Sequence, residues 1–516
     1  MQISSTRSKN KQLAINMAAS IVAFVVNFGI NFFLTPFIVS SLGAAAYGFV
    51  GLSNNIISYT QLITIALNSM AARFITIKYT QGDIDSANKY FSSVFYCNLI
   101  LSIFILLGMG IVVFYLNNIF EVPPAILTDV QLLFSILVFN TILGLMTNIY
   151  AVATFIKNRL ELTSLRQIGG YVIRAFILVL FFGCFSAKLW YIGFAGCMFT
   201  MYIGYYNYKY TRLLTPDIKV ESKYFDWFKV KELLYSGIWN TISKLGDLLQ
   251  RGFDLVFANV FIGATEMGIL SITTQIPFII LQLFSMLSSN FAPSMTTEYA
   301  HGNIEEIKRE LSKSVRILSI IMLVPLSALY IYGDVFYNLW IPSQDGHMLQ
   351  WLTICGTFAL VFTSPLESFW NIFTVTNKIK GSSIFVIVNS ILVFLTVLIL
   401  LLVTEDPTAK MFIIASVRSL YGVIRGILFL PIYGAKCLSL KWSYFYADIL
   451  KPILSLGLVI ILLFGLRLIY VPNDWLSFLF ATGIVSFISL AAGTILILNK
   501  SDIKMIKNKI YDKIKN

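Results

Sequence analysis

Long apolar runs alternate with short polar segments along the chain. Fourteen such runs can be distinguished, centred near residues 25, 58, 103, 140, 176, 197, 247, 280, 323, 360, 391, 420, 458 and 487. A helix needs about 20 predominantly apolar residues to span the hydrocarbon layer of a bilayer. The pattern therefore predicts an all-α integral membrane protein with fourteen transmembrane helices.

The first apolar run begins in a way that is also typical of a signal peptide. It follows Arg7, Lys9 and Lys11, and it extends from Leu13 to about Leu42. The apolar part of a signal peptide is only about 7–15 residues long. We therefore expect this run to stay in the protein as its first span.

A polar segment between two apolar runs recurs in the second half of the chain. The sequence YTQGDIDSANKYF at Tyr79 returns as YAHGNIEEIKREL at Tyr299, and GAAAYG at Gly43 returns as GATEMG at Gly263. The interval is 220 residues in both cases, and we call it the repeat offset. Between positions 37 and 94, 13 of 58 residues are identical to their counterparts at this offset. Similar apolar composition would produce some matches by coincidence, but a long fixed period is typical of internal duplication.

The duplication predicts how the helices are organised. The repeat offset carries span one onto span seven, so an even number of spans separates equivalent points and the halves are parallel repeats. We expect a six-helix N-terminal lobe over 1–208, a cytoplasmic linker over 209–231 and a six-helix C-terminal lobe over 232–435. Two additional helices and a basic cytoplasmic tail are expected over 436–516.

Positive charge is distributed unevenly between the two sides. One set of alternating loops, together with both termini, carries 30 of the 38 Lys and Arg residues, whereas the other set carries Lys188, Lys410 and Arg467. Basic loops stay in the cytoplasm, so both termini are predicted to be cytoplasmic. The net charge of +13 then reflects membrane topology and contact with anionic lipid, and no nucleic-acid partner is expected.

The composition excludes a water-soluble fold. Hydrophobic residues make up 57% of the chain and charged residues 12%, with a mean hydropathy of +0.79, whereas about 25% of the residues of a soluble protein are charged. No cofactor and no metal site are predicted. The cysteines form no CxxC pair and are expected to be buried apolar residues; they are Cys97, Cys184, Cys197, Cys355 and Cys437.

The seventh predicted span carries a polar stripe. Its members are Asn240, Lys244, Asp247, Arg251 and Asp254. Spacings of four, three, four and three place them on one helical face. Each charge at the centre of a span costs roughly 2.5–3.5 kcal/mol, so the face should meet protein or water. The stripe is either a self-neutral ladder of ion pairs within the helix or the lining of a cavity.

The repeat favours a cavity. A shift by the repeat offset places Asp247 on Asn27 and Arg251 on Asn31, so span one has a milder polar face at the equivalent positions. We expect the two faces to meet across a central cavity. The other predicted intramembrane charges of interest are Arg174, Arg418, Arg425 and Glu367. Summed over all spans, cations exceed acids by two, which favours an anionic substrate.

These features together resemble a known family. The opening sequence NMAASIVAFVVNFGINFFLTPFIVSSLGAAAYGFVGL, the parallel halves and the basic stripe look like the Wzx-type polysaccharide flippases, or O-antigen translocases, of the MOP superfamily, which also contains the MATE exporters. The resemblance implies transport of an undecaprenyl-diphosphate-linked oligosaccharide across a bacterial inner or plasma membrane by alternating access. It also implies a possible polysaccharide polymerase as a partner, and a MATE-like fold.

The substrate-binding and ion-coupling residues are predicted on this basis. The expected substrate-binding residues are Lys244, Arg251, Arg174, Arg418, Arg425, Asn27 and Asn31. The expected ion-coupling candidates are Asp247, Asp254 and Glu367.

Three other functions remain open from the sequence. A MATE-type exporter of organic cations would favour an acidic and aromatic cavity. A membrane enzyme of polysaccharide assembly generally needs a sizeable outer loop or cytosolic domain, and no nucleophile, Walker or HExxH pattern is present. The Asp83-Ile-Asp85 triplet resembles a metal-binding DxD motif of glycosyltransferases, although its repeat counterpart is Asn-Ile-Glu. A scaffold without transport activity would not need charges within the membrane.

Overall fold

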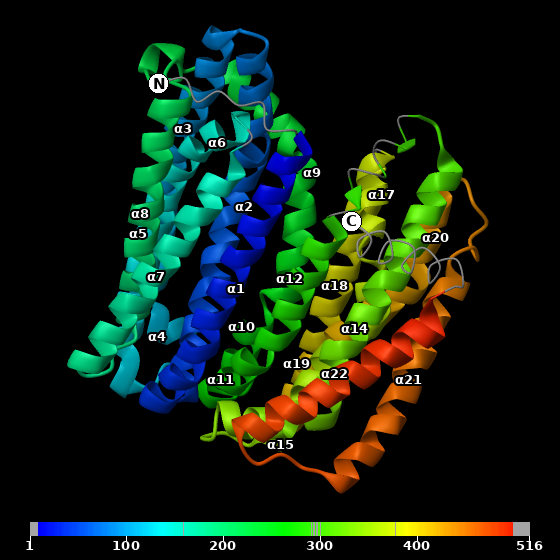
Figure 1. The fold of residues 1–516 in the computed structure, drawn as a ribbon. Coiled ribbons are helices and arrows are strands. Elements are labelled where there is room, and N and C mark those ends of the chain that lie inside the picture. Colours follow the sequence, from blue (N-terminus) through cyan, green and yellow to red (C-terminus); the bar gives the residue numbers. More distant parts are fainter. Residues whose placement is uncertain are drawn as a thin grey trace. The chain divides into compact units, whose positions relative to one another are not determined.

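The computed structural model describes residues 9–498 apart from residues 158, 290, 293–294, 296–297, 300 and 377. The predicted basic tail beyond residue 498 lies outside this range. All regular elements of the described residues are helices (Figure 1). Contacts divide the chain into two compact units, Met1–Gly268 and Ile269–Asn516.

The described residues of the first unit form six long helices and a seventh that packs on them. α9 lies against α2 and α3, and α7 lies beside both α1 and α8. The elements are α1 (Lys9–Leu42), α2 (Ala44–Thr80), α3 (Ile84–Phe114), α4 (Leu116–Ile119), η1 (Pro124–Ile126), α5 (Leu127–Asn148), η2 (Ile149–Ala151), α6 (Val152–Ile156), α7 (Leu160–Cys184), α8 (Trp190–Leu214), η3 (Ser222–Tyr224), α9 (Trp227–Arg251) and α10 (Asp254–Phe261).

The helix α11 (Ala264–Thr273) crosses the boundary, and the second unit continues from it. Its centre is the long helix α14, which contacts α15, α21 and α22. The elements are α12 (Gln275–Ser289), α14 (Ile304–Trp340), α15 (Gly346–Thr357), α16 (Leu360–Thr363), η4 (Ser364–Leu366), α17 (Phe369–Val375), α18 (Ile379–Val403), α19 (Pro407–Ile424), the π-helical η5 (Arg425–Phe429), α20 (Leu430–Cys437), α21 (Tyr446–Ile469) and α22 (Trp475–Ile497).

The all-α, multi-pass membrane architecture predicted from the sequence is confirmed. Among the described residues, 11 segments are long and apolar enough to cross a membrane. Each of the predicted span centres falls within a helix. The helices α2, α8 and α9 are not among those 11. The count of fourteen spans therefore stays a prediction.

The repeated polar loop has the same geometry in both places. Gly82 and Gly302 have φ values of 79° and 72°, a left-handed conformation that glycine adopts without a steric penalty. The next residue caps the following helix in each case: Asp83 accepts from Ser86 N–H at 3.1 Å, and Asn303 accepts from Glu306 N–H at 3.3 Å. The structure thus supports the duplication.

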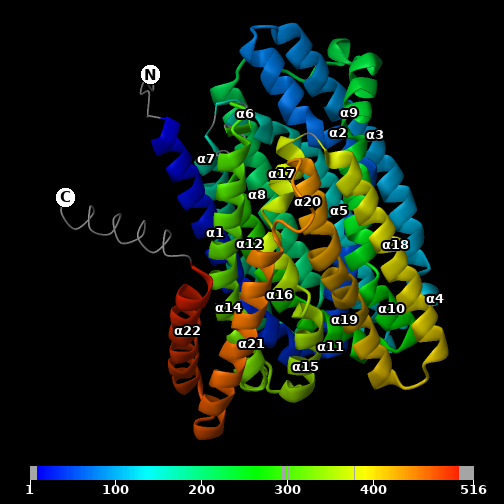
Figure 2. The same cartoon turned by 90° about the vertical axis from the view of Figure 1, so that its right-hand side faces the viewer.

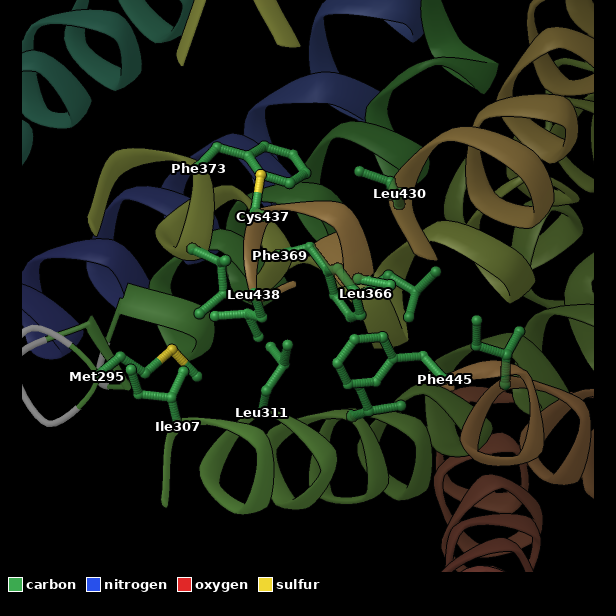
Figure 3. Close-up of a cluster of buried hydrophobic side chains, with 14 residues drawn as sticks. Met295, Ile307, Leu311, Leu366, Phe369, Phe373, Leu430, Cys437, Leu438 and Phe445 are labelled. Carbon is green, nitrogen blue, oxygen red and sulfur yellow. The ribbon is translucent and has the colours of Figure 1, made fainter. Parts of the chain in front are cut away.

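The repeat offset also relates the buried cores, which the sequence identities did not reveal. One hydrophobic cluster lies in the first unit and another in the second, where Figure 3 shows side chains from α14, α17, α20 and the segment before α21. The pairs of cluster members separated by the repeat offset are Ile75 and Met295, Ala87 and Ile307, Phe91 and Leu311, Ile149 and Phe369, Val152 and Ile372, and Ile218 and Leu438. Residues can change while their buried positions persist, because core packing tolerates volume-conserving exchanges.

The period continues into the helix that follows each core. Leu233 of α9 belongs to the first cluster, and its counterpart at the repeat offset, Ile453 of α21, packs against the second. The lobes were predicted from the duplication, whereas the compact units are defined by contacts. The boundaries predicted at 208, 231 and 435 therefore stay predictions.

The last two helices are fixed to α14 (Figure 2). Arg467 of α21 binds Asp334 with both terminal nitrogens, at 2.8 and 2.5 Å. At the other end of α21, Arg316 of α14 pairs with Asp448 at 3.5 Å. The hydroxyl groups of Ser327 in α14 and Ser489 in α22 lie 2.7 Å apart. Polar contacts at both ends and in the middle thus hold α21 and α22 in register with α14.

Candidate substrate-binding site

Arg174 is a cation inside the membrane-spanning part of α7. This helix belongs to the candidate span Glu161–Cys184. The Nε atom of Arg174 is buried and has no hydrogen-bond partner, and within the described part of the chain no carboxylate pairs with the guanidinium. Its ionisable neighbours are Tyr47 of α2 and Tyr171 of α7. Charged residues within a span are costly and mark substrate or ion pathways.

A line of polar side chains on α1 leads towards this arginine. Asn31 donates to both the backbone carbonyl and the side-chain oxygen of Asn27, at 2.9 and 3.0 Å. Thr35 donates to the Asn31 carbonyl at 2.9 Å and lies 3.3 Å from the Tyr47 hydroxyl. Since α1 and α7 lie side by side (Figure 1), three predicted site residues belong to one polar region of the first unit.

Three members of this region were not predicted from the sequence. Thr35 continues the four-residue spacing of Asn27 and Asn31, so helical periodicity would have found it. Tyr47 and Tyr171 carry no such signal, because a tyrosine in an apolar run is usually an interfacial or core residue.

The polar stripe of the seventh predicted span extends over two helices in the structure. α9 ends at Arg251 and α10 begins at Asp254, with Gly252 and Phe253 between them. Asn55 of α2 donates to the Gly252 carbonyl at 3.3 Å, and the Tyr59 ring stacks on Phe253. The glycine admits this close approach, because a Cβ atom there would stand 2.6 Å from Tyr59 Cε1.

The stripe residues are only partly described. Lys244 is half-buried on α9, and Asp254 is buried at the first position of α10. The side chains of Asn240, Asp247 and Arg251 lie outside the part of the chain that the structure describes. Whether the stripe is a ladder of ion pairs, and whether Asp247 meets Asn27, therefore stay predictions.

The remaining predicted residues belong to the second unit. Arg418 lies within α19, and Arg425 opens the π-helical turn of five residues that follows it. π-helical turns are rare and frequently occur at functional sites. This turn packs against α16, where a Cβ atom on Gly426 would stand 2.9 Å from Phe362 Cβ. Glu367 is half-buried between η4 and α17.

The Asp83-Ile-Asp85 triplet is engaged in local structure. Asp83 caps α3 and lies 3.6 Å from Lys78, while Asp85 pairs with Lys89 at 2.6 Å. Each of the two acidic side chains therefore has a partner within the chain, so a metal ion is not needed to account for their positions. The described residues contain no group of three or more His, Cys, Asp and Glu side chains able to hold a metal ion.

No protein-family model matches the chain. It is 27% identical to the uncharacterized membrane protein EpsK of Bacillus subtilis (strain 168) over 502 residues, covering 96% of this chain and 97% of that protein. The similarity extends over both compact units.

Solved structures define the class of fold. The chain resembles an inward-facing multidrug resistance MATE family transporter of the MOP superfamily with a TM-score of 0.62 and 13% identity, covering 81% of this chain and 99% of the other. A MOP superfamily transporter from Pyrococcus furiosus is similar with a TM-score of 0.61 and 12% identity, over 82% and 95% of the two chains. The protein therefore has the fold of the MATE transporters of the MOP superfamily.

Proposed function

We propose that this protein is a flippase that moves an undecaprenyl-diphosphate-linked oligosaccharide from the cytoplasmic to the outer leaflet by alternating access. The proposal rests on one observation: the buried guanidinium of Arg174 forms no ion pair with a carboxylate among the described residues. A charge of this kind is costly in a span unless a ligand of opposite charge repays the cost. Arginine suits a diphosphate because its planar guanidinium binds phosphate with two parallel hydrogen bonds.

The transporter fold supports the same proposal. The solved structure from Pyrococcus furiosus was described as having a binding pocket of reverse polarity that suggests a different function. A fold shared with cation exporters can thus serve other substrates when the charge in its interior changes, since function belongs to the site and not to the fold.

In this proposal the cations bind the diphosphate, and the asparagines of α1 bind polar groups of the substrate. The cations are Arg174, Lys244, Arg251, Arg418 and Arg425. Asp247, Asp254 and Glu367 are the proposed ion-coupling groups. We place the protein in the plasma or inner membrane of a bacterium with both termini in the cytoplasm, beside a polysaccharide polymerase, and we assign it no catalytic step.

The test is a deletion strain in which the sidedness of the lipid-linked glycan is measured. Loss of the protein should trap the glycan on the cytoplasmic leaflet, and the wild-type gene should restore export. Arg174→Gln should reach the membrane at normal levels and fail to restore export. Arg174→Lys should restore it partly, because lysine keeps the charge without the two-pronged geometry. Full export by Arg174→Gln would reject the proposed role of this residue.

The alternative function is export of organic cations, and the MATE structures favour it through their shared fold. This function predicts a different phenotype for the same strain. Deletion would leave glycan export unchanged and would sensitise the cells to lipophilic cations. That result would contradict the flippase proposal and support the export of organic cations.

A further inference from the structure

Three cations at one end of α7 and α8 are held by tyrosine side chains. The Cζ atom of Arg166 in α7 lies 4.2 Å from the centre of the Tyr206 ring, and its Nε donates to the Tyr210 hydroxyl at 2.8 Å. The Nζ atom of Lys209 lies 5.9 Å from the centre of the same ring. Arg212 is the third member. We call Arg166, Lys209 and Arg212 the tyrosine-held cluster.

Arg212 has the same kind of partner on another face of α8. Its Nε donates to the Tyr208 hydroxyl at 3.1 Å, and its Cζ lies 5.3 Å from the centre of that ring. A cation above an aromatic face gains about 0.5–1 kcal/mol at an exposed site. This attraction orients the cation but does not neutralise its charge.

The tyrosine-held cluster differs from other cations at the same predicted cytoplasmic end. Lys78 and Lys89 pair with Asp83 and Asp85, and Lys223 pairs with Glu221. In contrast, no described carboxylate lies within ion-pair distance of a member of the cluster. These three positive charges therefore have no acidic partner among the described residues.

The surroundings of the cluster are those of the lipid headgroup region. Leu165 and Leu213, which adjoin Arg166 and Arg212 in the chain, are 54% and 66% exposed, and Tyr205 is 62% exposed. The cluster lies near the start of α7, a candidate span, and near the end of α8. Exposed apolar residues beside tyrosines and cations are typical of the boundary between hydrocarbon and headgroups.

We propose that the tyrosine-held cluster binds the phosphate group of an anionic phospholipid. The lipid phosphate supplies the counter-charge that the three cations lack, the arginines offer hydrogen bonds that suit a phosphate, and the exposed leucines offer apolar surface to the acyl chains. A free phosphate ion would use only the cations. A lipid uses both the cations and the apolar surface, so the lipid is the occupant that fits. This inference does not depend on the transported substrate.

The test is native mass spectrometry of the full-length protein with dioleoyl phosphatidylglycerol or dioleoyl phosphatidylcholine. The wild-type protein should retain phosphatidylglycerol more strongly. Each cation near a membrane surface contributes a factor of about five in affinity for anionic lipid. The double change Lys209→Gln with Arg212→Gln should therefore lower the affinity about 25-fold. These two side chains are exposed, and the change leaves the Arg166–Tyr210 hydrogen bond in place.

The matched control is Lys78→Gln with Lys89→Gln, which removes two cations that are already paired with carboxylates. It should lower the affinity by less than about fivefold. Equal losses in both double variants would overturn the proposal, because they would show a diffuse charge effect. Equal retention of the two lipids, or displacement of phosphatidylglycerol by inorganic phosphate, would also overturn it.

Discussion

Gly48 and Gly268 occupy equivalent positions of the repeat and contact each other. A Cβ atom on Gly48 would stand 2.8 Å from Gly268 N, and one on Gly268 would stand 2.1 Å from the Ala44 carbonyl oxygen. Backbone atoms cannot move aside as the tip of a flexible side chain can. At the scale of single residues, the recurrence of these glycines therefore has a steric cause, which is the close approach of α2 and α11.

We predict that Gly268→Ala destabilises the protein by at least about 1–3 kcal/mol, the usual cost of overpacking. Thermal unfolding of the detergent-solubilised protein would measure the loss. Gly108→Ala is the matched control, because a Cβ atom at Gly108 has open space within 4 Å. It should leave stability unchanged or raise it, since alanine is the better helix former. Equal stability of both variants would contradict the close approach.

A second prediction at this scale concerns the cap of α3. Hydrogen bonds from Ser86, the backbone N–H foremost, hold the pKa of Asp83 below its ordinary value. The stabilisation from the ionised cap is therefore complete above the ordinary pKa of about 3.9 and is lost as the pH falls through the lower value of the folded state. Asp83→Asn should keep the cap at every pH, as Asn303 does in the second repeat.

Amide hydrogen exchange at residues 84–90 would check this prediction. The ratio of exchange rates between wild type and Asp83→Asn should stay constant at neutral pH and rise only under strong acid. The amides of Asp83→Ala should exchange faster than those of Asp83→Asn at all pH values, because the alanine removes the cap. If Asp83→Asn behaved like Asp83→Ala at neutral pH, the side-chain cap would not be what holds the start of α3.

At the scale of elements, the predicted linker between the lobes is fastened to α3. Asn88, Ser92 and Ser93 each donate to one backbone carbonyl of residues 217–226 and accept from one backbone N–H, at 2.9–3.2 Å. All three side chains are buried. Paired backbone groups keep this irregular segment folded, because buried polar groups without partners are costly. We call residues 217–226 the strap.

We predict that Ser92→Ala with Ser93→Ala releases the strap. Each substitution leaves a backbone donor and acceptor without a partner, at a cost of about 1–3 kcal/mol. Limited digestion with trypsin should then cleave faster at Lys219 and Lys223, within the strap. Ser135→Ala is the control, because the Ser135 hydroxyl only donates to its own helix and is exposed. Unchanged cleavage in the double variant would show that the strap is held by other contacts.

At the scale of the whole molecule, the charge distribution predicts the orientation in the membrane. The loops rich in Lys and Arg alternate with loops that carry almost none, and 11 segments of the described residues are long and apolar enough to cross a membrane. Orientation itself is set by interaction with the membrane during insertion. It is therefore a separate property from the fold and needs its own experiment.

Reporter fusions after Asn118, Asp345 and Asp474 should report the outside of the cell. Fusions after Asp83, Asp226 and Lys513 should report the cytoplasm. A cytoplasmic signal from the Asp345 fusion would break the fourteen-span prediction. Since α2, α8 and α9 are not among the 11 candidate spans, additional fusions placed directly before and after each of these helices would decide whether it crosses the membrane.

The sequence by itself determined the class of fold, the helices and the duplication. Apolar runs about 20 residues long have few alternatives to spanning helices, because the bilayer offers the backbone no hydrogen bonds. Glycines with positive φ and capping residues recur in the chain, so the repeated loop could be read directly. The buried pairs of the two cores could not be found in this way, because Ile149 and Phe369 share a position without sharing an identity.

Only the tertiary structure decided which polar residues act together. Helical spacing placed Lys244 and Asp254 on one face, whereas the structure shows that they belong to two helices, α9 and α10, and that Asn55 and the Tyr59 ring of α2 pack against Gly252 between them. Spacing likewise joined Asn27 to Asn31, whereas the path from Thr35 through Tyr47 towards Arg174 crosses three helices. Periodicity describes one helix at a time, and contacts between helices depend on packing against neighbours that a single pattern does not encode.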